Sequence, residues 1–193
     1  MDLPLFPLNT VLFPGSRLDL RIFEPRYLDM IRDCMRADIG FGVCMILDGR
    51  DAGQPAIPAT LGTQAHIVDF STLPDGLLGI TVQGGARVRI DGTRVNGAGL
   101  TIGDVAVLAP DPQLLIPTQH ALLVTILQRL ADHEDTELSR ASKSSFDDAA
   151  WVGFRLADRM PIALDDRQLI LRMDDPLARL DQLAHWLPRF QRE

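Results

Sequence analysis

Lysine, cysteine and long apolar runs are all scarce in this sequence, and each shortage excludes a class of protein. Lys143 is the only lysine among 193 residues, and the net charge is −7 at pH 7. Because proteins bind nucleic acids mainly through basic side chains that neutralise phosphates, this balance argues against nucleic acid as the main partner. No run approaches the roughly 18 consecutive apolar residues that a membrane span requires, so we expect no membrane partner.

The two cysteines predict neither a disulfide nor a metal site. Cys34 and Cys44 lie on different apolar faces and follow no metal-ligand or redox spacing, so we expect two buried, reduced thiols. The N-terminal residues have neither the basic segment nor the continuous apolar core of a signal peptide. Together these features predict a cytoplasmic protein.

Motifs that indicate an enzyme are missing as well. A phosphate-binding loop ends in Gly-Lys-Ser/Thr, whereas Lys143 follows a serine. The segment Ser142–Ser145 supplies a Ser–Lys dyad only if its lysine is buried, and it lies in a polar stretch that we interpret as an exposed loop. We therefore predict no catalytic residue, no metal ligand and no cofactor. Two further groups are interpreted as structural or solvent-facing: the histidines His66, His120, His133 and His185, and the acidic run Asp132, Glu134, Asp135 and Glu137.

Residues 1–112 have the pattern of a β domain, in which short apolar runs alternate with Gly, Pro and Asp turns. Many short antiparallel strands that curl to hide their edges predict a small barrel or pseudo-barrel. One helix is expected from Pro25, with Tyr27, Met30, Ile31, Cys34 and Met35 on its apolar face, packed across an open end of the barrel. The predicted strands are Val11–Phe13, Arg17–Ile22, Phe41–Leu47, Gln64–Phe70, Leu77–Gln83, Arg87–Ile90 and Leu100–Leu108.

Residues 113–193 have helical periodicity instead. A first helix over Thr118–Asp132 carries an apolar stripe that begins at Leu122. A second helix is expected to be capped by Asp147, with Trp151 in the core. A short third helix follows Asp165 or Asp166, and Asp175-Pro176 opens a last one. The sequence thus predicts an α+β fold, a β pseudo-barrel crossed by one helix and followed by a bundle of about four helices.

The N-terminal segment carries the most specific pattern in the chain. Leu3–Gly15, Leu18–Tyr27 and Met30–Cys34 resemble the opening of the Lon N-terminal, or LON substrate-binding, domain family. Gly85–Ile90 and Asp175–Leu180 resemble later parts of the same domain, although Val88 stands where an aromatic residue is common. The resemblance implies a PUA-like β domain followed by a helical bundle, and a role in substrate recognition. Because the chain ends at Glu193, we expect neither the ATPase module nor the Ser–Lys protease module of a complete Lon protease.

The leading hypothesis is a non-catalytic module that binds exposed apolar polypeptide segments, as an adaptor or a chaperone. Its expected partners are unfolded or partly folded polypeptides, with Lon or another protease as a further candidate and a homodimer left open. Phe23, Arg26 and Tyr27 are the predicted polypeptide-binding residues, because aromatic residues and arginine are common at interaction hot spots; a purely fold-specifying role is the alternative. Two other functions stay open, an enzyme or small-molecule binder in a cleft between barrel and bundle, and an RNA-binding module, which the acidic charge disfavours.

Overall fold

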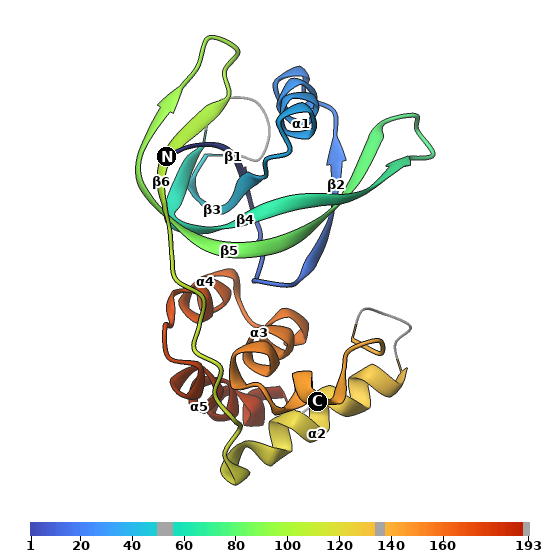
Figure 1. The fold of residues 1–193 in the computed structure, drawn as a ribbon, viewed down its shortest axis with the longest axis vertical. Coiled ribbons are helices and arrows are strands. Elements are labelled where there is room, and N and C mark those ends of the chain that lie inside the picture. The colour runs from blue at the N-terminus through green and yellow to red at the C-terminus, as the bar shows by residue number, and fades with distance from the viewer. Residues whose placement is uncertain (50–55, 134–137, 191–193) are drawn as a thin grey trace. The chain divides into compact units, whose positions relative to one another are not determined.

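The computed structural model describes residues 1–49, 56–133 and 138–190, and the chain divides into two units, Met1–Pro110 and Asp111–Glu193 (Figure 1). The boundary predicted from sequence lies after residue 112. Glu134, Asp135 and Glu137 of the acidic run lie outside the described residues, as does part of the loop predicted there.

The N-terminal unit is built on one mixed, six-stranded sheet that closes through its longest strand. The strands are β1 (Asp2–Leu8), β2 (Arg17–Ile22), β3 (Phe41–Asp48), β4 (Ile57–Thr72), β5 (Leu78–Val95) and β6 (Thr101–Val107). Their order is β2-β5-β4-β3-β1-β6, and β6 pairs again with β5, which closes the ring. Because β1 and β3 are parallel and β2 stands outside the ring on β5, the unit is a pseudo-barrel and not a regular barrel.

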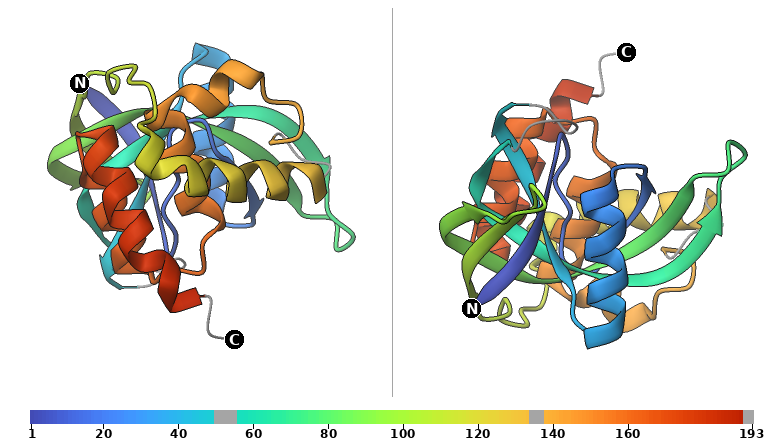
Figure 2. Two further views of the ribbon diagram at one scale, coloured as in Figure 1. Left: turned by 90° about the horizontal axis from the view of Figure 1, so that it is seen from below. Right: turned by 90° about the horizontal axis from the view of Figure 1, so that it is seen from above.

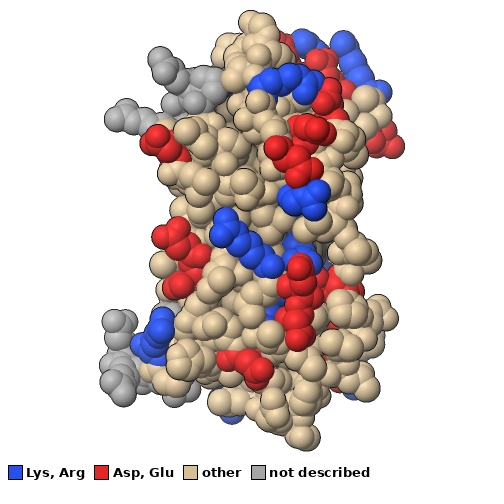
Figure 3. Space-filling model, turned by 90° about the vertical axis from the view of Figure 1, so that its left-hand side faces the viewer, with Lys and Arg blue, Asp and Glu red and all other residues tan. Residues whose placement is uncertain are grey.

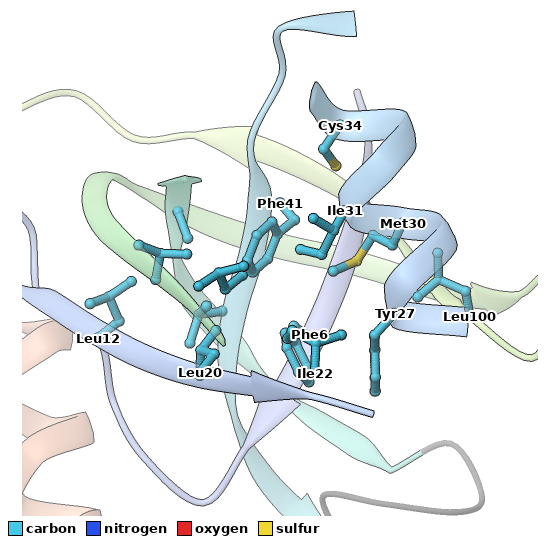
Figure 4. Close-up of a cluster of buried hydrophobic side chains, with 14 residues drawn as sticks. Phe6, Leu12, Leu20, Ile22, Tyr27, Met30, Ile31, Cys34, Phe41 and Leu100 are labelled. Carbon is cyan, nitrogen blue, oxygen red and sulfur yellow. The ribbon is translucent and has the colours of Figure 1, made fainter. Parts of the chain in front are cut away.

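The helix predicted from Pro25 is present as α1 (Pro25–Ala37), and it runs across the concave side of the curled sheet (Figure 2). It buries Tyr27, Met30, Ile31 and Cys34 against Phe41 and other side chains of the strands (Figure 4). The prediction that Met35 lies on the same buried face is wrong, since half of its surface is exposed. The apolar face of α1 therefore ends one residue earlier than helical spacing suggested.

Both cysteines are buried, and they belong to different apolar clusters. Cys34 lies in the cluster under α1, whereas Cys44 lies in a smaller one with Leu3, Leu5 and Val88. Burial, with a smaller contribution from Asp33, raises the pKa of the Cys34 thiol to about 11. Burial alone raises the pKa of the Cys44 thiol to about 12, so both thiols are protonated at neutral pH.

The first strand differs from the prediction. β1 (Asp2–Leu8) was not predicted, because Pro4 and Pro7 interrupt its pattern and prolines are rare in paired strands. The predicted strand Val11–Phe13 is wrong: this segment is buried but lies outside the strands. Its backbone is hydrogen-bonded in other ways, as where the hydroxyl of the distant Thr63 donates a hydrogen bond of 2.6 Å to the carbonyl of Leu12. The apolar residues of this segment correctly indicated that it is buried, but they did not indicate whether it pairs with another strand.

The predicted strands Leu77–Gln83 and Arg87–Ile90 are one continuous strand, β5, joined through Gly84 and Gly85. Gly84 has no dinucleotide-binding role; it allows the turn before β2 to approach the strand. Its N–H donates to the carbonyl of Ser16 (2.8 Å), and its carbonyl accepts from the N–H of Gly15 (2.7 Å). A β-carbon at position 84 would collide with the carbonyl oxygen of Phe13.

We expect Gly84→Ala to lower the free energy of unfolding of the N-terminal unit by about 1–3 kcal/mol, the usual cost of overpacking a tight contact. The obstacle is backbone, so no side-chain rotation relieves it. Gly92→Ala is the matched control, because it lies on the same strand and its β-carbon would meet nothing within 4 Å. Urea unfolding followed by circular dichroism measures both, and equal stabilities of the two variants would contradict the expectation.

The C-terminal unit is a bundle of four α-helices in its described part, as predicted. The helical segments are η1 (Thr118–His120), α2 (Ala121–His133), η2 (Lys143–Asp147), α3 (Ala149–Arg159), α4 (Leu164–Arg172), α5 (Pro176–Trp186) and η3 (Leu187–Phe190). Leu123 and Leu127 of α2 are fully buried, together with Leu156 of α3 and Leu183 of α5. Leu122, predicted on the buried stripe of α2, is 57% exposed instead.

Only some of the predicted side-chain caps are found at the N-termini of the helices. Asp175 caps α5 as predicted, because its carboxylate accepts a hydrogen bond from the N–H two residues later (2.9 Å). α3 is capped in the same way by Asp148 and not by Asp147, since η2 occupies the preceding residues. α4 has no side-chain cap; Asp165 and Asp166 lie inside its first turn, where negative charge favours the helix dipole.

A buried arginine joins three parts of the helical unit. Arg179 of α5 is fully buried, and its Nη2 donates to the carboxylate of Asp111 (2.7 Å) and to the carbonyl of Met173 (2.6 Å). Its guanidinium carbon lies 3.6 Å from the centre of the Phe154 ring on α3. The start of the unit, α3 and the segment between α4 and α5 therefore all depend on one side chain.

Candidate functional site

The three residues predicted to bind polypeptides do not share one surface. Tyr27 is 6% exposed and its ring stacks on Phe6, with 4.0 Å between centroids. Arg26 is almost as deeply placed: it donates to the carbonyl of Gly99 (2.9 Å) and forms an ion pair with Glu24 (2.9 Å). Only Phe23, 53% exposed, offers its side chain to solvent. A binding role for the three residues stays a prediction, and for Arg26 and Tyr27 it would have to act through the placement of α1.

Three adjoining hollows in the C-terminal unit were missed by the sequence analysis. Their volumes are about 510, 460 and 680 Å³. The first and second share Leu115, the second and third share Phe146, and Asp147 lines all three. We call these hollows together the Leu115 groove. Its main side chains are Leu115, Val124, Phe146, Asp147 and Trp151.

Backbone hydrogen bonds hold one wall of the Leu115 groove in place. The extended segment 113–117 lies against the end of η2, where Leu115 and Asp148 form a single antiparallel β-bridge. The carbonyl of Leu114 accepts from the N–H of Ala149 (2.8 Å). With its backbone fixed in this way, Leu115 presents a side chain that is 82% exposed. Among the exposed large apolar side chains in the described part of this unit, that of Leu115 has the greatest exposed fraction.

Aromatic side chains form the floor between the hollows. The rings of Phe146 and Trp151 meet edge to face, with centroids 5.1 Å apart and planes at 68°. Trp151 was predicted in the core but is only half-buried, and its free part lines the first hollow. Ala121, Val124 and Gln128 of α2 extend the lining along the second and third hollows. The groove thus combines apolar, aromatic and amide surface, the composition typical of polypeptide-binding sites.

The Ser-Lys-Ser-Ser segment borders the groove without the geometry of a catalytic dyad. Ser142 caps η2, and its hydroxyl lies 2.8 Å from that of Ser144 and 2.9 Å from that of Ser145. Lys143 is exposed. A lysine base requires desolvation, which an exposed side chain does not have.

The histidines and carboxylates of the described residues form no group of three or more that could hold a metal ion. His120 is buried and its Nε2 lies 3.1 Å from Oδ1 of Asp181, a two-residue pair that ties η1 to α5. No helix among the described residues has the length and apolar character needed to cross a membrane. On the face drawn in Figure 3, basic and acidic side chains are interspersed and neither forms a continuous patch.

Comparison with known proteins gives one family over nearly the whole chain. The family described as "ATP-dependent protease La (LON) substrate-binding domain" matches residues 2–189. Lon protease of Escherichia coli (strain K12) is 26% identical over 195 residues, and Lon protease of Roseiflexus castenholzii is 29% identical over 203 residues. These alignments cover 95% and 97% of this chain but 24% of each relative, so the chain spans about a quarter of their length.

Solved structures agree with this result. A Lon N-terminal domain protein from Xanthomonas campestris superposes with a TM-score of 0.81 at 41% identity, over 96% of this chain and 98% of that chain. The N-terminal domain of Mycobacterium avium complex Lon protease has a TM-score of 0.70 at 15% identity, over 98% and 100%, which shows likeness of fold alone. The α+β fold predicted from the sequence is confirmed by both.

Proposed function

We propose, given that this chain belongs to the LON substrate-binding domain family, that it recognises unfolded or partly folded polypeptides and holds them without changing them chemically. The family match is to a substrate-binding domain, which supports a role in recognition. We infer from this family that the bound molecules are polypeptides. The site on this chain that suits a polypeptide best is the Leu115 groove.

The exposed side chain of Leu115 is the observation that carries the proposal of this site. Unfolded chains differ from folded ones by displaying apolar side chains and free backbone, and both fit a groove with an apolar and aromatic lining. Burying apolar surface contributes about 25 cal/mol per Å². Because the loss of translational and rotational freedom on association offsets much of that gain, a few apolar side chains support only a weak, reversible interaction. Such an interaction suits the handing of a substrate to another protein, in an adaptor or chaperone role with Lon or another protease as partner. The cytoplasmic location and a homodimer stay predictions.

Leu115→Asp is expected to weaken binding of a fluorescently labelled, permanently unfolded polypeptide at least about tenfold, a typical loss when a hot-spot side chain is removed. Fluorescence anisotropy measures it, with the full chain titrated into the polypeptide. Leu169→Asp is the matched control, because it places the same change on α4, outside the Leu115 groove, at a leucine that is 45% exposed. Phe23→Ser in the same titration tests the site predicted from sequence.

The outcomes separate the claims. Loss in Leu115→Asp alone supports the groove, whereas loss in Phe23→Ser alone moves the site to the N-terminal unit. Wild-type protein that binds no unfolded polypeptide would overturn the proposed function itself. Binding that persists at high salt is expected, because apolar contacts are not screened by ions.

A further inference from the structure

We propose that the Leu115 groove selects polypeptide segments in which a lysine or arginine stands between apolar residues, and that Asp147 is the residue that recognises the basic side chain. This inference rests on the proposed function and adds the class of segment that is preferred.

Asp147 occupies a central place in the groove. It lines all three hollows, whereas Leu115 and Phe146 each line two of them. Its side chain is exposed, and it is the last residue of η2. Its carbonyl accepts a hydrogen bond of 3.3 Å from the N–H of Ile116, so the carboxylate is presented from a fixed backbone. A polypeptide lying in adjacent hollows therefore passes Asp147, whichever of the hollows its apolar side chains enter.

Most of the other charged residues that line the groove are acidic, like Asp147. Asp148 lines the first hollow and Asp132 the third, against one basic residue, Lys143, in the third. The carboxylate of Asp148 is engaged in capping α3, whereas Asp147 lines both of the first two hollows together with their apolar residues. The charge of the groove is thus complementary to a basic segment and repels an acidic one.

Lysine and arginine also fit the apolar lining. Their aliphatic stems pack along apolar surface while the charged end reaches a polar partner. Leu115 and the Phe146 ring provide such surface beside Asp147. A guanidinium can in addition lie against an aromatic ring, as Arg179 lies on Phe154 elsewhere in this unit. The basic residue would therefore be accepted in the middle of an apolar segment and not only at its ends.

The selection is expected to be modest. Exposed ion pairs contribute little, so we expect the apolar residues to supply most of the affinity and Asp147 to supply a preference of about threefold to fivefold at low salt. The preference should disappear at high ionic strength, whereas apolar binding should remain.

Three labelled peptides test the inference with the full-length chain. They share one apolar sequence and differ only in a central residue, which is Lys, Gln or Glu. We expect wild-type protein to bind the Lys peptide about threefold to fivefold more tightly than the Gln peptide, with the Glu peptide weakest. Asp147→Asn should bind all three alike. Asp33→Asn, which makes the same charge change at an exposed position on α1, should keep the wild-type order.

Each result has one meaning. If wild type binds the Lys and Gln peptides equally, the selectivity is refuted while polypeptide binding stands. If the order persists in Asp147→Asn, or disappears in Asp33→Asn, recognition by Asp147 is refuted. If no peptide binds in any variant, both the inference and the proposed function fall. Circular dichroism of Asp147→Asn checks that the variant is folded before the titrations are compared.

Discussion

Arg179→Met is expected to lower the free energy of unfolding of the C-terminal unit by about 3–5 kcal/mol, the cost of leaving one partner of a buried ion pair alone. Arg179 is fully buried, and the side chain of its partner Asp111 is 6% exposed. Methionine fills similar space but cannot donate to the Asp111 carboxylate or to the carbonyl of Met173. The carboxylate must then stay charged in a poorly solvated place or take up a proton, and both destabilise the fold.

Tryptophan fluorescence during urea unfolding isolates this effect, because Trp151 and Trp186, the two tryptophans of the chain, both belong to the C-terminal unit. Arg172→Met on the exposed side of α4 is the control, with an expected change within about 0.5 kcal/mol. Replacing both partners, Arg179→Met with Asp111→Leu, should recover much of the loss, since a buried pair can be exchanged for apolar residues at little cost. A single variant within about 1 kcal/mol of wild type would refute this account of the pair.

Phe41→Ala is expected to lower the free energy of unfolding of the N-terminal unit by about 3–5 kcal/mol, as is typical of phenylalanine truncation in a core. Phe41 has no exposed surface and lies in the cluster under α1, with its ring centroid 6.0 Å from that of Phe6. The cavity would open between the helix and the sheet, where several rigid strands meet. Little collapse is available to fill it, which places the expected cost in the upper part of this range.

This unit contains no tryptophan, so its unfolding needs another probe. Hydrogen exchange of the β5 amides reports its opening free energy directly, and far-UV circular dichroism gives a second value. Phe70→Ala on β4 is the control, because that ring is 46% exposed and should cost less than about 1 kcal/mol. Equal losses in the two variants would mean that Phe41 is not the core residue that its burial indicates.

Local chemistry allowed much of the fold to be predicted. The Pro74-Asp75-Gly76 turn forms as expected, with Gly76 at a φ of 83° that favours glycine and a hydrogen bond from the N–H of Leu73 to the carbonyl of Leu77 (2.9 Å). Asp175 and Pro176 likewise begin α5 as their types suggest. The length of β5 could not be predicted, because its glycines break the apolar pattern while the contacts at these glycines come from distant residues such as Ser16.

The candidate site was harder to predict for the same reason. The Leu115 groove forms where an extended segment contacts η2, more than twenty residues further along the chain. The periodicity of apolar residues does not predict a contact between segments so far apart. A usable signal existed: Leu114, Leu115 and Ile116 form an apolar run between Pro112 and Pro117, too short for a helix and outside every predicted element. For Tyr27 two sequence signals differ: its aromatic type suggested a surface contact, whereas its helical spacing with Met30 placed it inward, where the side chain is found.

The pairing of β1 with β6 has a consequence for how the chain folds during its synthesis on the ribosome. Asp2 stands opposite Asp104 in this pair, so β1, which can pair with β3 early, finds its second neighbour only after about one hundred further residues have been made. At about 5–20 residues per second, the ribosome needs on the order of 5–20 s for that length, during which the β6 edge of β1 keeps free backbone groups. Such high contact order also slows the folding step itself. During its own synthesis the chain therefore passes through a state that displays the kind of segment it is proposed to bind.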